Sequence, residues 1–492
     1  MEKPNIVLVM ADDMGYWAMG CAGNREIRTP NLDQLAAEGM YFPDFFCTSP
    51  VCSPARASVL CGRMPSAHGV QDWIARGHIS YGEVAPGLKE KHGDPDASWE
   101  YAWSRQQLKD DSAIRYMEGF RTYTDILAEH GYVCGLAGKW HLGDAGHPQN
   151  GFTYWQPIAM GGDNYFYPVV LQGEKFDMLR NTYITNYITG KAFKFLRNRD
   201  NGKPFYLSVH YTAPHSPWER SQHPAEFYDL YRDCPFTGTP NVPPHKWGAG
   251  YSQEDRRNRI QGYYAAVTAM DSDIGKLVGY LKEEGLWEDT VFIFTADNGM
   301  SMGHHGIFGK GNGTFPMNLY DTAVKVPMIV SCPGRIPAGS VARGLYSHYD
   351  ILPTIAGLMG EAPEEGLPGR SFQEIFQGRV PDGRDAVVVY DEYGPARMIR
   401  TREYKYIHRY PYGENEFYDL EADPGEEVNL AESKDPAVQE RIAALKNRME
   451  QWFVRYSDPD RDGVRQAVCG SGQIGLVGSA GKGRKAFLGL GE

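Results

Sequence analysis

Short apolar runs that end in polar side chains alternate along this chain with segments of helical periodicity. The stretch "NIVLVMADD" opens the series, and similar runs occur in "YVCGLAGKWHLG", "KPFYLSVHYTAPHSPW", "DTVFIFTADNG" and "VKVPMIVSCPG". Between them lie helical patterns such as "TPNLDQLAAEGMYF", which starts near Thr29 or Asn31 and stops at Gly39, and "AAVTAMDSDIGKLVGYLKEEG". This alternation predicts an α/β fold with a mostly parallel sheet sandwiched by helices.

The residues that follow these predicted strands are chemically unusual. In open parallel sheets, ligands bind beyond the carboxyl ends of the strands. The polar side chains expected at those ends are Asp12, Asp13, Lys139, His141, His215, Asp297 and Asn298. The sequence therefore predicts a functional site along this edge of the sheet.

The sequence pattern changes near residue 385, where apolar and polar residues begin to alternate. This pattern predicts a small antiparallel sheet, followed by a helix that begins after Asp435 at Pro436. We expect a catalytic α/β domain over residues 1–384, a small α+β subdomain over 385–457 and a loosely ordered, glycine-rich tail over 458–492. Residues 71–118 are irregular and aromatic, which suits a long functional loop or a plain surface insertion.

The charge balance limits the partners. The 50 Lys and Arg residues against 62 Asp and Glu residues give a net charge of −12, which argues against nucleic acid as a partner. Eight scattered cysteines without a C-x-x-C pair suggest free thiols. The N-terminal apolar run is too short for a signal sequence, and no stretch is long enough to span a membrane. The chain as given therefore reads as cytoplasmic unless a leader was trimmed; its oligomeric state stays open.

The stretch "SPVCSPARASVLCGR" places Cys52 at the expected start of a helix. Pro54 suits a first helical turn, and Gly62 can end the helix. A helix N-terminus favours negative charge, and Arg56 adds a positive charge one turn later. Taken alone, Cys52 is more simply a small buried side chain, because free cysteines usually are.

The wider pattern resembles the formylglycine-dependent (type I) sulfatases of the alkaline-phosphatase-like superfamily. Cys52, Pro54 and Arg56 match the family signature Cys-x-Pro-x-Arg. The stretches "ADDMG", "CSPARASVLCGR", "GKWHLG", "APHSPW", "TADNG" and "FGKG" follow in the order found in the family and cover nearly the whole chain. The resemblance implies the alkaline-phosphatase-like α/β fold with a small C-terminal domain.

The resemblance also implies a chemistry for Cys52. In the family a separate formylglycine-generating or anaerobic sulfatase-maturating enzyme oxidises this cysteine to Cα-formylglycine, whose hydrated aldehyde attacks the sulfur of a sulfate ester. The matching positions imply that Arg56 holds the oxidised side chain and that His215 protonates the leaving alcohol. His141 would help expel sulfate, and Lys139 and Lys310 are candidates for binding the sulfate oxygens.

The carboxylates point to a metal. Asp12, Asp13, Asp297 and Asn298 form an all-oxygen set, which suits a hard cation. The resemblance favours Ca²⁺, with Mg²⁺ as the alternative, and adds the oxidised residue 52 as a ligand. Adjacent carboxylates repel each other unless a cation lies between them, although Asp297-Asn298-Gly299 alone would also suit an ordinary turn.

The leading prediction is a sulfuric ester hydrolase that acts on a small sulfated substrate, an O-sulfated saccharide from a glycosaminoglycan or mucin-type glycan. The alternatives are a phosphodiesterase or phosphonate monoester hydrolase of the same superfamily and a non-catalytic binding protein. Residues that suit the rim of a sugar site, or a rim that only packs, are His305, Asp72, Trp73, Trp218 and Glu219.

Overall fold

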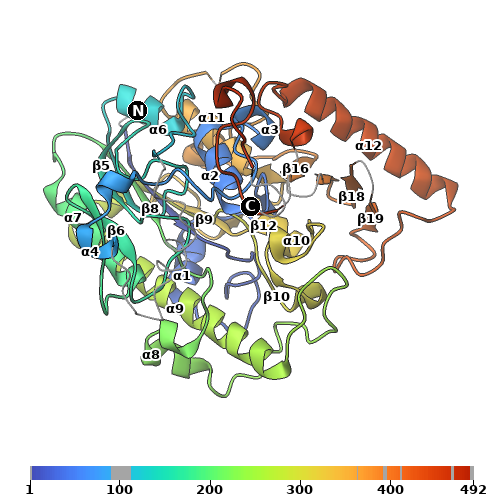
Figure 1. Cartoon of the computed structure of the whole chain (residues 1–492), viewed down its shortest axis with the longest axis horizontal. Coiled ribbons are helices and arrows are strands. Elements are labelled where there is room, and N and C mark those ends of the chain that lie inside the picture. Colours follow the sequence, from blue (N-terminus) through green and yellow to red (C-terminus); the bar gives the residue numbers. More distant parts are fainter. Residues whose placement is uncertain are drawn as a thin grey trace.

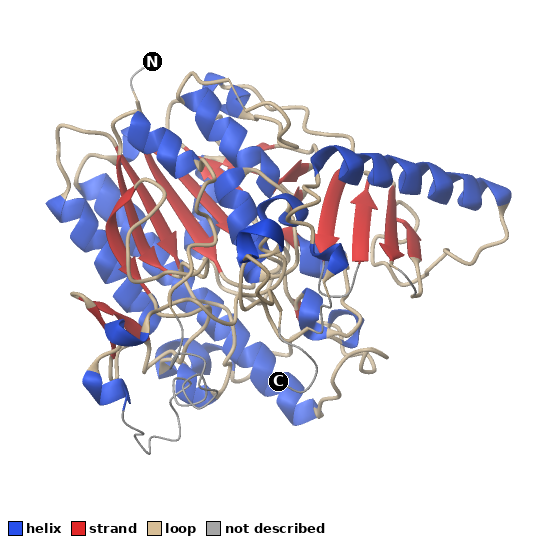
Figure 2. Ribbon diagram, turned by 45° about the horizontal axis from the view of Figure 1, so that its top comes forward, coloured by secondary structure: helices blue, strands red, loops and turns tan. Residues whose placement is uncertain are grey.

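The computed structural model describes residues 3–89, 112–362, 364–391, 396–410, 413–466 and 470–487. Its centre is an eight-stranded sheet flanked by helices (Figures 1 and 2). In spatial order its strands are β14 (Ser340–Val341), β2 (Met40–Tyr41), β13 (Met328–Ser331), β9 (Thr290–Ala296), β1 (Asn5–Ala11), β8 (Phe205–His210), β4 (Val133–Gly138) and β5 (Phe152–Pro157).

The sheet is mostly parallel, as predicted. The neighbours β9, β1, β8, β4 and β5 all run in the same direction, whereas β13 is antiparallel to both β9 and β2. Strands β1 and β9 are almost completely buried, so their sequences are continuous apolar runs without alternation.

Helices cover both faces of this sheet. One layer consists of α1 (Pro30–Glu38), α7 (Ile184–Asn198) and α9 (Gln253–Glu283), and the other of α2 (Cys52–Cys61), α6 (Tyr123–Glu129) and α11 (Ile351–Leu358). Strand β4 shows both contacts: Cys134 reaches the carbonyl of Thr124 in α6, while a side chain at Gly135 would meet Phe195 of α7. Adjacent strand residues face opposite sides of a sheet, so the two layers lie on opposite faces.

The predicted helices agree with the structure except at one start. Helix α1 ends at Glu38, just before Gly39. Helix α9 begins at Gln253 rather than near Ala265, because Ser252 and Asp255 form a reciprocal capping box that extends it toward the N-terminus. Its buried Asp271 accepts hydrogen bonds from the first backbone N–H groups of α1, which has no side-chain cap of its own.

The second unit is the expected small antiparallel sheet with a helix (Figure 2). Its strands are β16 (Val387–Asp391), β17 (Ala396–Arg400), β18 (Tyr404–Arg409) and β19 (Glu416–Asp419), and α12 (Pro436–Tyr456) packs across β17 and β18. Asp435 caps α12 by accepting a 2.9 Å hydrogen bond from the N–H of Ala437, as the sequence predicts. Buried ion pairs from Asp321 to Arg400 and Lys405 tie this unit to the central one.

Smaller elements complete the fold. Within the described ranges, the other strands form three minor sheets: β3 (Phe45–Phe46), β12 (Lys325–Val326) and β15 (Tyr346–Ser347); β6 (Val169–Gln172) and β7 (Lys175–Met178); β10 (Ser301–Met302) and β11 (Phe308–Gly309). The other α-helices of the described residues are α3 (Pro65–His68), α4 (Pro86–Lys89), α8 (Ala225–Tyr228) and α10 (Asp321–Val324). Among the described helices, none is both long and apolar enough to cross a membrane.

The glycine-rich tail departs from expectation. Instead of being loosely ordered, residues 470–487 pack against the central unit, and Gln473 is fully buried. The predicted functional loop is described at 71–89 and 112–118, and its first part lines the main cavity. Residues 90–111 of that loop lie outside the described residues.

Candidate active site

Three buried carboxylates meet at the carboxyl edge of the central sheet. Strands β1 and β9 pair in parallel with Ala11 opposite Ala296, so the residues that follow them are neighbours. The backbone N–H of Asp13 donates to Asp297 Oδ1 at 3.1 Å, and Asn298 Nδ2 donates to Asp13 Oδ1 at 2.9 Å. Asp12 lies beside them, completely buried. The structure therefore brings together all four predicted metal-binding positions of these two loops.

Each carboxylate has a cationic partner. Lys139 Nζ lies 2.6 Å from Asp12 Oδ2, and Lys310 Nζ lies 2.6 Å from Asp13 Oδ1. Arg56 Nε donates to Asp297 Oδ2 at 2.8 Å. These six residues carry three negative and three positive charges, and all are buried. Removal from water is tolerable for such groups only when each charge is paired.

Burial and pairing compete in setting the carboxyl pKa values. Burial raises the pKa of Asp12, and the nearby Lys139 only partly offsets it. Burial also acts to raise the pKa of Asp13, but Lys310 and His215 outweigh it and hold that pKa below 3.8. At Asp297, Arg56 and Lys139 likewise overcome burial and lower the pKa. Asp13 and Asp297 are therefore ionised at neutral pH.

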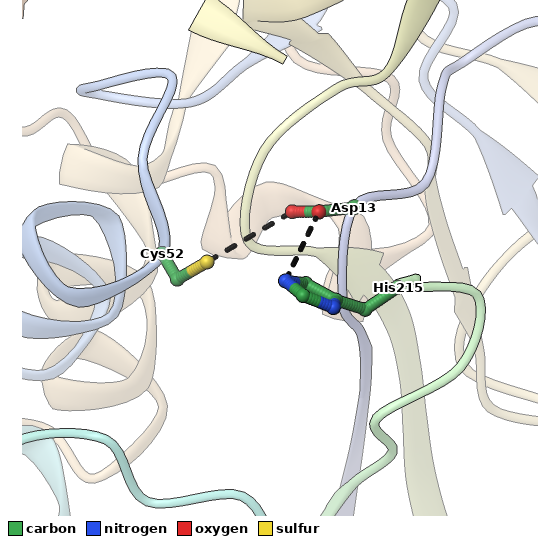
Figure 3. A group of neighbouring side chains, drawn as sticks. All are labelled: Asp13, Cys52 and His215. Carbon is green, nitrogen blue, oxygen red and sulfur yellow. Dashed lines mark hydrogen bonds and ion pairs between the residues drawn. The ribbon is translucent and has the colours of Figure 1, made fainter. Parts of the chain in front are cut away.

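Cys52 is the first residue of α2, at the helix end that faces these carboxylates (Figure 3). The helix ends before Gly62, as the sequence predicts; the φ of Gly62 is left-handed at 65°, and its N–H donates to the carbonyl of Ser58. Cys52 Sγ lies 3.8 Å from Asp13 Oδ1 and 2.6 Å from Lys310 Nζ. Burial raises the pKa of this thiol to about 12, despite the opposing effect of the two lysines. An unmodified Cys52 is therefore a neutral thiol and a poor nucleophile at pH 7.

His215 approaches the same carboxylate from the loop after β8. Its Nε2 lies 3.6 Å from Asp13 Oδ2, and Figure 3 shows the ring and Cys52 each facing a different oxygen of the Asp13 carboxylate. Its Nδ1 lies 2.7 Å from the carbonyl oxygen of Ser216, which fixes Nδ1 as the protonated donor. Nε2 consequently carries a proton only in the imidazolium form, and can deliver it to a group in the cavity.

His141 lines the cavity two residues after Lys139. Its Nε2 lies 3.1 Å from the carbonyl oxygen of Ile74, and Nδ1 has no hydrogen-bond partner within the described part of the chain. Burial, followed by the charge of Lys139, lowers the pKa of His141 well below 6.5. The ring is therefore neutral, with a free lone pair on Nδ1 when Nε2 donates to Ile74.

The donor set fits a hard divalent cation. Ligand atoms of Asp12, Cys52 and Asp297 lie within 4.8 Å of one another. Two buried oxygens, Asp12 Oδ1 and Asn298 Oδ1, have no hydrogen-bond partner among the described residues. Orphaned buried oxygens beside several carboxylates are typical of a site built for a cation with oxygen ligands.

A cavity of about 570 Å³ opens above these groups. Its lining includes Cys52, Asp13, His141, His215 and Lys310, together with the predicted rim residues Trp73 and Trp218. Tryptophan faces suit the apolar faces of a ring-shaped ligand.

Three other predicted contact residues do not line this cavity. Asp72 is fully buried, and its carboxylate accepts from the N–H of Trp73. Glu219 is an exposed residue that precedes a 3₁₀ turn. His305 stacks on Tyr320 with ring centroids 3.7 Å apart and lines a separate cavity of about 330 Å³. The backbone of His305 is left-handed, with a φ of 51°.

Sequence reasoning missed several residues around the histidines. Gly161 and Gly162 line the cavity, and a β-carbon at Gly161 would lie 2.1 Å from the His141 ring. The carbonyl of Ile74 lies close to both His141 and His78. A Gly-Gly pair can mark a close approach of the backbone to another group and could have been noticed, whereas a backbone carbonyl leaves no sequence signal.

Comparison with known proteins gives a consistent result. Residues 4–361 match the family described as Sulfatase, and residues 303–455 match the family described as N-sulphoglucosamine sulphohydrolase, C-terminal. The chain is 26% identical to an N-acetylglucosamine-6-O-sulfatase of Bacteroides thetaiotaomicron, over 94% of this chain and 88% of that protein. It is 28% identical to an arylsulfatase of Clostridium perfringens, over 90% and 93% of the two chains.

A solved structure shares the fold. It is a protein in complex with its substrate D-glucosamine-2-N,6-O-disulfate, with a TM-score of 0.74 and 24% identity. The match covers 94% of this chain and the whole of that one. The arrangement of sheet, helices and small C-terminal unit described above is therefore the alkaline-phosphatase-like fold.

Proposed function

Because the chain belongs to the sulfatase family and is a sulfuric ester hydrolase, we propose that residue 52, matured from cysteine to Cα-formylglycine, carries its nucleophile. We propose further that the substrate is an O-sulfated saccharide. The observation that carries the proposal is the position of Cys52, at the N-terminus of α2, beside Lys310 and Asp13, on the wall of the cavity.

Conversion of Cys52 to formylglycine would supply chemical groups that the unmodified thiol lacks. The hydrated aldehyde of formylglycine supplies a hydroxyl that can attack sulfur and a second hydroxyl whose proton can later be removed. The buried Cys52 thiol, with its pKa raised to about 12, offers neither group. We propose that a separate oxygen-dependent or anaerobic maturating enzyme makes the conversion.

The proposed metal is Ca²⁺, with Mg²⁺ as the alternative. Asp12, Asp13, Asp297 and Asn298 would hold it together with the oxidised residue 52. The ion would supply positive charge that lowers the pKa of a neighbouring hydroxyl and neutralises charge on the sulfate. The orphaned oxygens of Asp12 and Asn298 support this ligand set.

The cations of the site account for anion binding. Three carboxylates balance Lys139, Lys310 and Arg56, so a divalent ion would bring this group of charges to about +2. That excess favours the monoanionic sulfate ester. Lys310 lines the cavity and is the better placed of the two lysines to meet a sulfate oxygen, whereas Lys139 is fully buried against Asp12.

The two histidines take opposite proton-transfer roles. His215, with Nδ1 held by the Ser216 carbonyl, is the proposed general acid that protonates the leaving alcohol from Nε2. His141 is neutral and has a free Nδ1, which suits a proton acceptor during expulsion of sulfate. Arg56 stays paired with Asp297 and donates to the Lys139 carbonyl, so its role is to hold the frame of the site.

A saccharide substrate is supported by two observations. Trp73 and Trp218 line the cavity, and a relative is named N-acetylglucosamine-6-O-sulfatase. The test is a panel of sulfated mono- and disaccharides assayed for free sulfate with matured enzyme, beside an aryl sulfate and an aryl phosphodiester. Preferred release of sulfate from one saccharide supports the proposal. Faster cleavage of the phosphodiester than of every sulfate would instead favour a phosphodiesterase or phosphonate monoester hydrolase.

A further inference from the structure

Gln473 is a fully buried polar residue in the glycine-rich tail. Its side-chain Oε1 accepts from the N–H of Gln71 at 2.8 Å, and its Nε2 donates to the carbonyl of Gly69 at 2.8 Å. The same Nε2 also donates to the carbonyl of Gly475, within the tail, at 2.9 Å. One side chain therefore satisfies backbone groups of a segment some 400 residues earlier in the sequence.

The backbone of Gln473 continues this pairing. Its N–H donates to the carbonyl of Trp73, and its carbonyl accepts from the N–H of Ala75, both at 2.8 Å. Ile74 and Gln473 thus form a parallel β-bridge. Trp73, Ile74 and Ala75 are consecutive residues in the wall of the active-site cavity. The tail therefore pairs with the backbone of that wall.

The same wall contacts catalytic positions. The carbonyl of Ile74 lies 2.9 Å from His78 Nε2 and 3.1 Å from His141 Nε2. The N–H of Ile74 donates to the hydroxyl of Ser53, the residue after Cys52, at 3.1 Å. A shift of this segment would therefore move both the Trp73 surface and the hydrogen bond that orients His141.

The tail is itself anchored. The N–H of Ile474 donates to the carbonyl of Ala486, and Val477, Ala486 and Phe487 form a small apolar cluster. At Gly472 the approach is very close, because a β-carbon there would lie 2.8 Å from Ala75 and 2.9 Å from the Trp73 ring. A side chain at this position must displace Ala75 or Trp73, and the φ of +94° favours glycine.

We propose that the tail segment 470–475 is a structural part of the active site and that Gln473 is a positioning residue for its Trp73–Ala75 wall. It acts through that wall, not by touching substrate. The identity of the reaction in this proposal rests on the proposed function. The effect of Gln473 on the Trp73–Ala75 wall can be measured without any enzymatic turnover.

The first measurement is hydrogen exchange on the full-length protein. In Gln473→Ala, amides of residues 69–78 should exchange at least about tenfold faster than in the wild type, whereas amides of β1 keep their rates. Arg484→Ala, an exposed substitution in the same tail, should leave both regions unchanged. Unaltered protection of residues 69–78 in Gln473→Ala overturns the proposal, even if the enzyme proves to act on another substrate.

The second measurement is a kinetic cycle on a saccharide sulfate. Gln473→Ala should raise KM about tenfold, with a smaller fall in kcat, because the carboxylates and Lys310 are held by other loops. In a Trp73→Ala background, the same substitution should raise KM less than about threefold, because the surface it positions is gone. Equal effects in the two backgrounds would mean that Gln473 only stabilises the fold, and would contradict the proposal.

Gly472→Ala provides an independent variant in case Gln473→Ala does not fold. The added methyl group pushes against Ala75 and Trp73, so KM should rise about tenfold by the same route. A folded Gly472→Ala enzyme with the KM of the wild type, and with unchanged exchange at residues 69–78, overturns the proposal.

Discussion

Arg56 Nε donates a 2.8 Å hydrogen bond to Asp297 Oδ2 where both side chains are buried. Burial alone would lower the pKa of Arg56 and raise that of Asp297, yet the pair reverses both shifts. The same guanidinium donates to the carbonyl of Lys139 at 3.2 Å. One arginine thus links the helix of Cys52 to the strand ends that carry the carboxylates.

Replacing this arginine should damage both stability and activity. Arg56→Lys keeps the charge but cannot form the fork to Asp297 and Lys139, and we expect a loss of about 3 kcal/mol in unfolding free energy. Sulfate release should fall at least about a hundredfold, because the carboxylates are no longer held in position by the arginine. Denaturant unfolding and sulfate assays measure the two effects. Arg63→Lys, at a half-exposed pair with Glu364, is the matched control and should cost less than about 1 kcal/mol.

Removal of the proposed metal should abolish activity reversibly. A chelator should eliminate sulfate release and lower the unfolding temperature, because an ion that binds only the folded state stabilises it. Added Ca²⁺ should restore both properties. Asp297→Ala should bind no stoichiometric metal by elemental analysis, whereas Glu83→Gln, in the separate cluster with Asp144 and His147, should keep it. A full equivalent of tightly held ion in Asp297→Ala would remove Asp297 from the ligand set.

The role of His215 predicts a dependence on the leaving group. An alkoxide leaving from a sugar needs a proton far more than a nitrophenolate does, so His215→Ala should lose about 10²–10⁴ in kcat/KM on a saccharide sulfate. The loss on a nitrophenyl sulfate should be much smaller. His147→Ala, an exposed histidine outside the cavity, serves as the control. Equal losses on both substrates would argue against proton donation.

Asp271 should make stability depend on pH. Burial raises the pKa of this carboxyl from 3.8 to about 6, despite the hydrogen bonds that it accepts from α1. The folded state therefore binds its proton more tightly than the unfolded state, so stability from this group is present below pH 4 and is lost as the pH rises through 6.

The uncharged variant Asp271→Asn isolates this effect. As the pH rises from 4 to 7, the unfolding free energy of Asp271→Asn should increase relative to that of the wild type by up to about 3 kcal/mol, because the amide does not ionise. Unfolding curves of both proteins at several pH values give the difference directly. A difference that stays constant across this range would refute the assignment.

The sequence predicted the parts of the site that depend on strand ends. Asp12, Asp13, Lys139, Asp297 and Asn298 meet because parallel strands finish at one edge of a sheet, which the apolar runs already indicate. The start and the end of helix α2 were predictable from the local preferences of Pro54 and Gly62.

Other features depend on contacts that no local pattern reveals. Gln473 lies in a glycine-rich tail, and its burial arises from pairing with Trp73 and Ala75 some 400 residues away. His305 adopts a left-handed backbone conformation and stacks on Tyr320, so its proximity to the "FGKG" stretch in sequence did not bring it into the main cavity. Both outcomes are set by tertiary packing rather than by composition or periodicity.

The nucleophile assignment can be tested by relating modification to turnover. Trypsin should release residue 52 within the peptide of residues 29–56, and mass spectrometry of that peptide gives the fraction converted from thiol to aldehyde. Across preparations matured to different extents, sulfate release should rise in proportion to that fraction, and Cys52→Ala should release none. Normal sulfate release from unconverted enzyme, or from Cys52→Ala, would contradict the account.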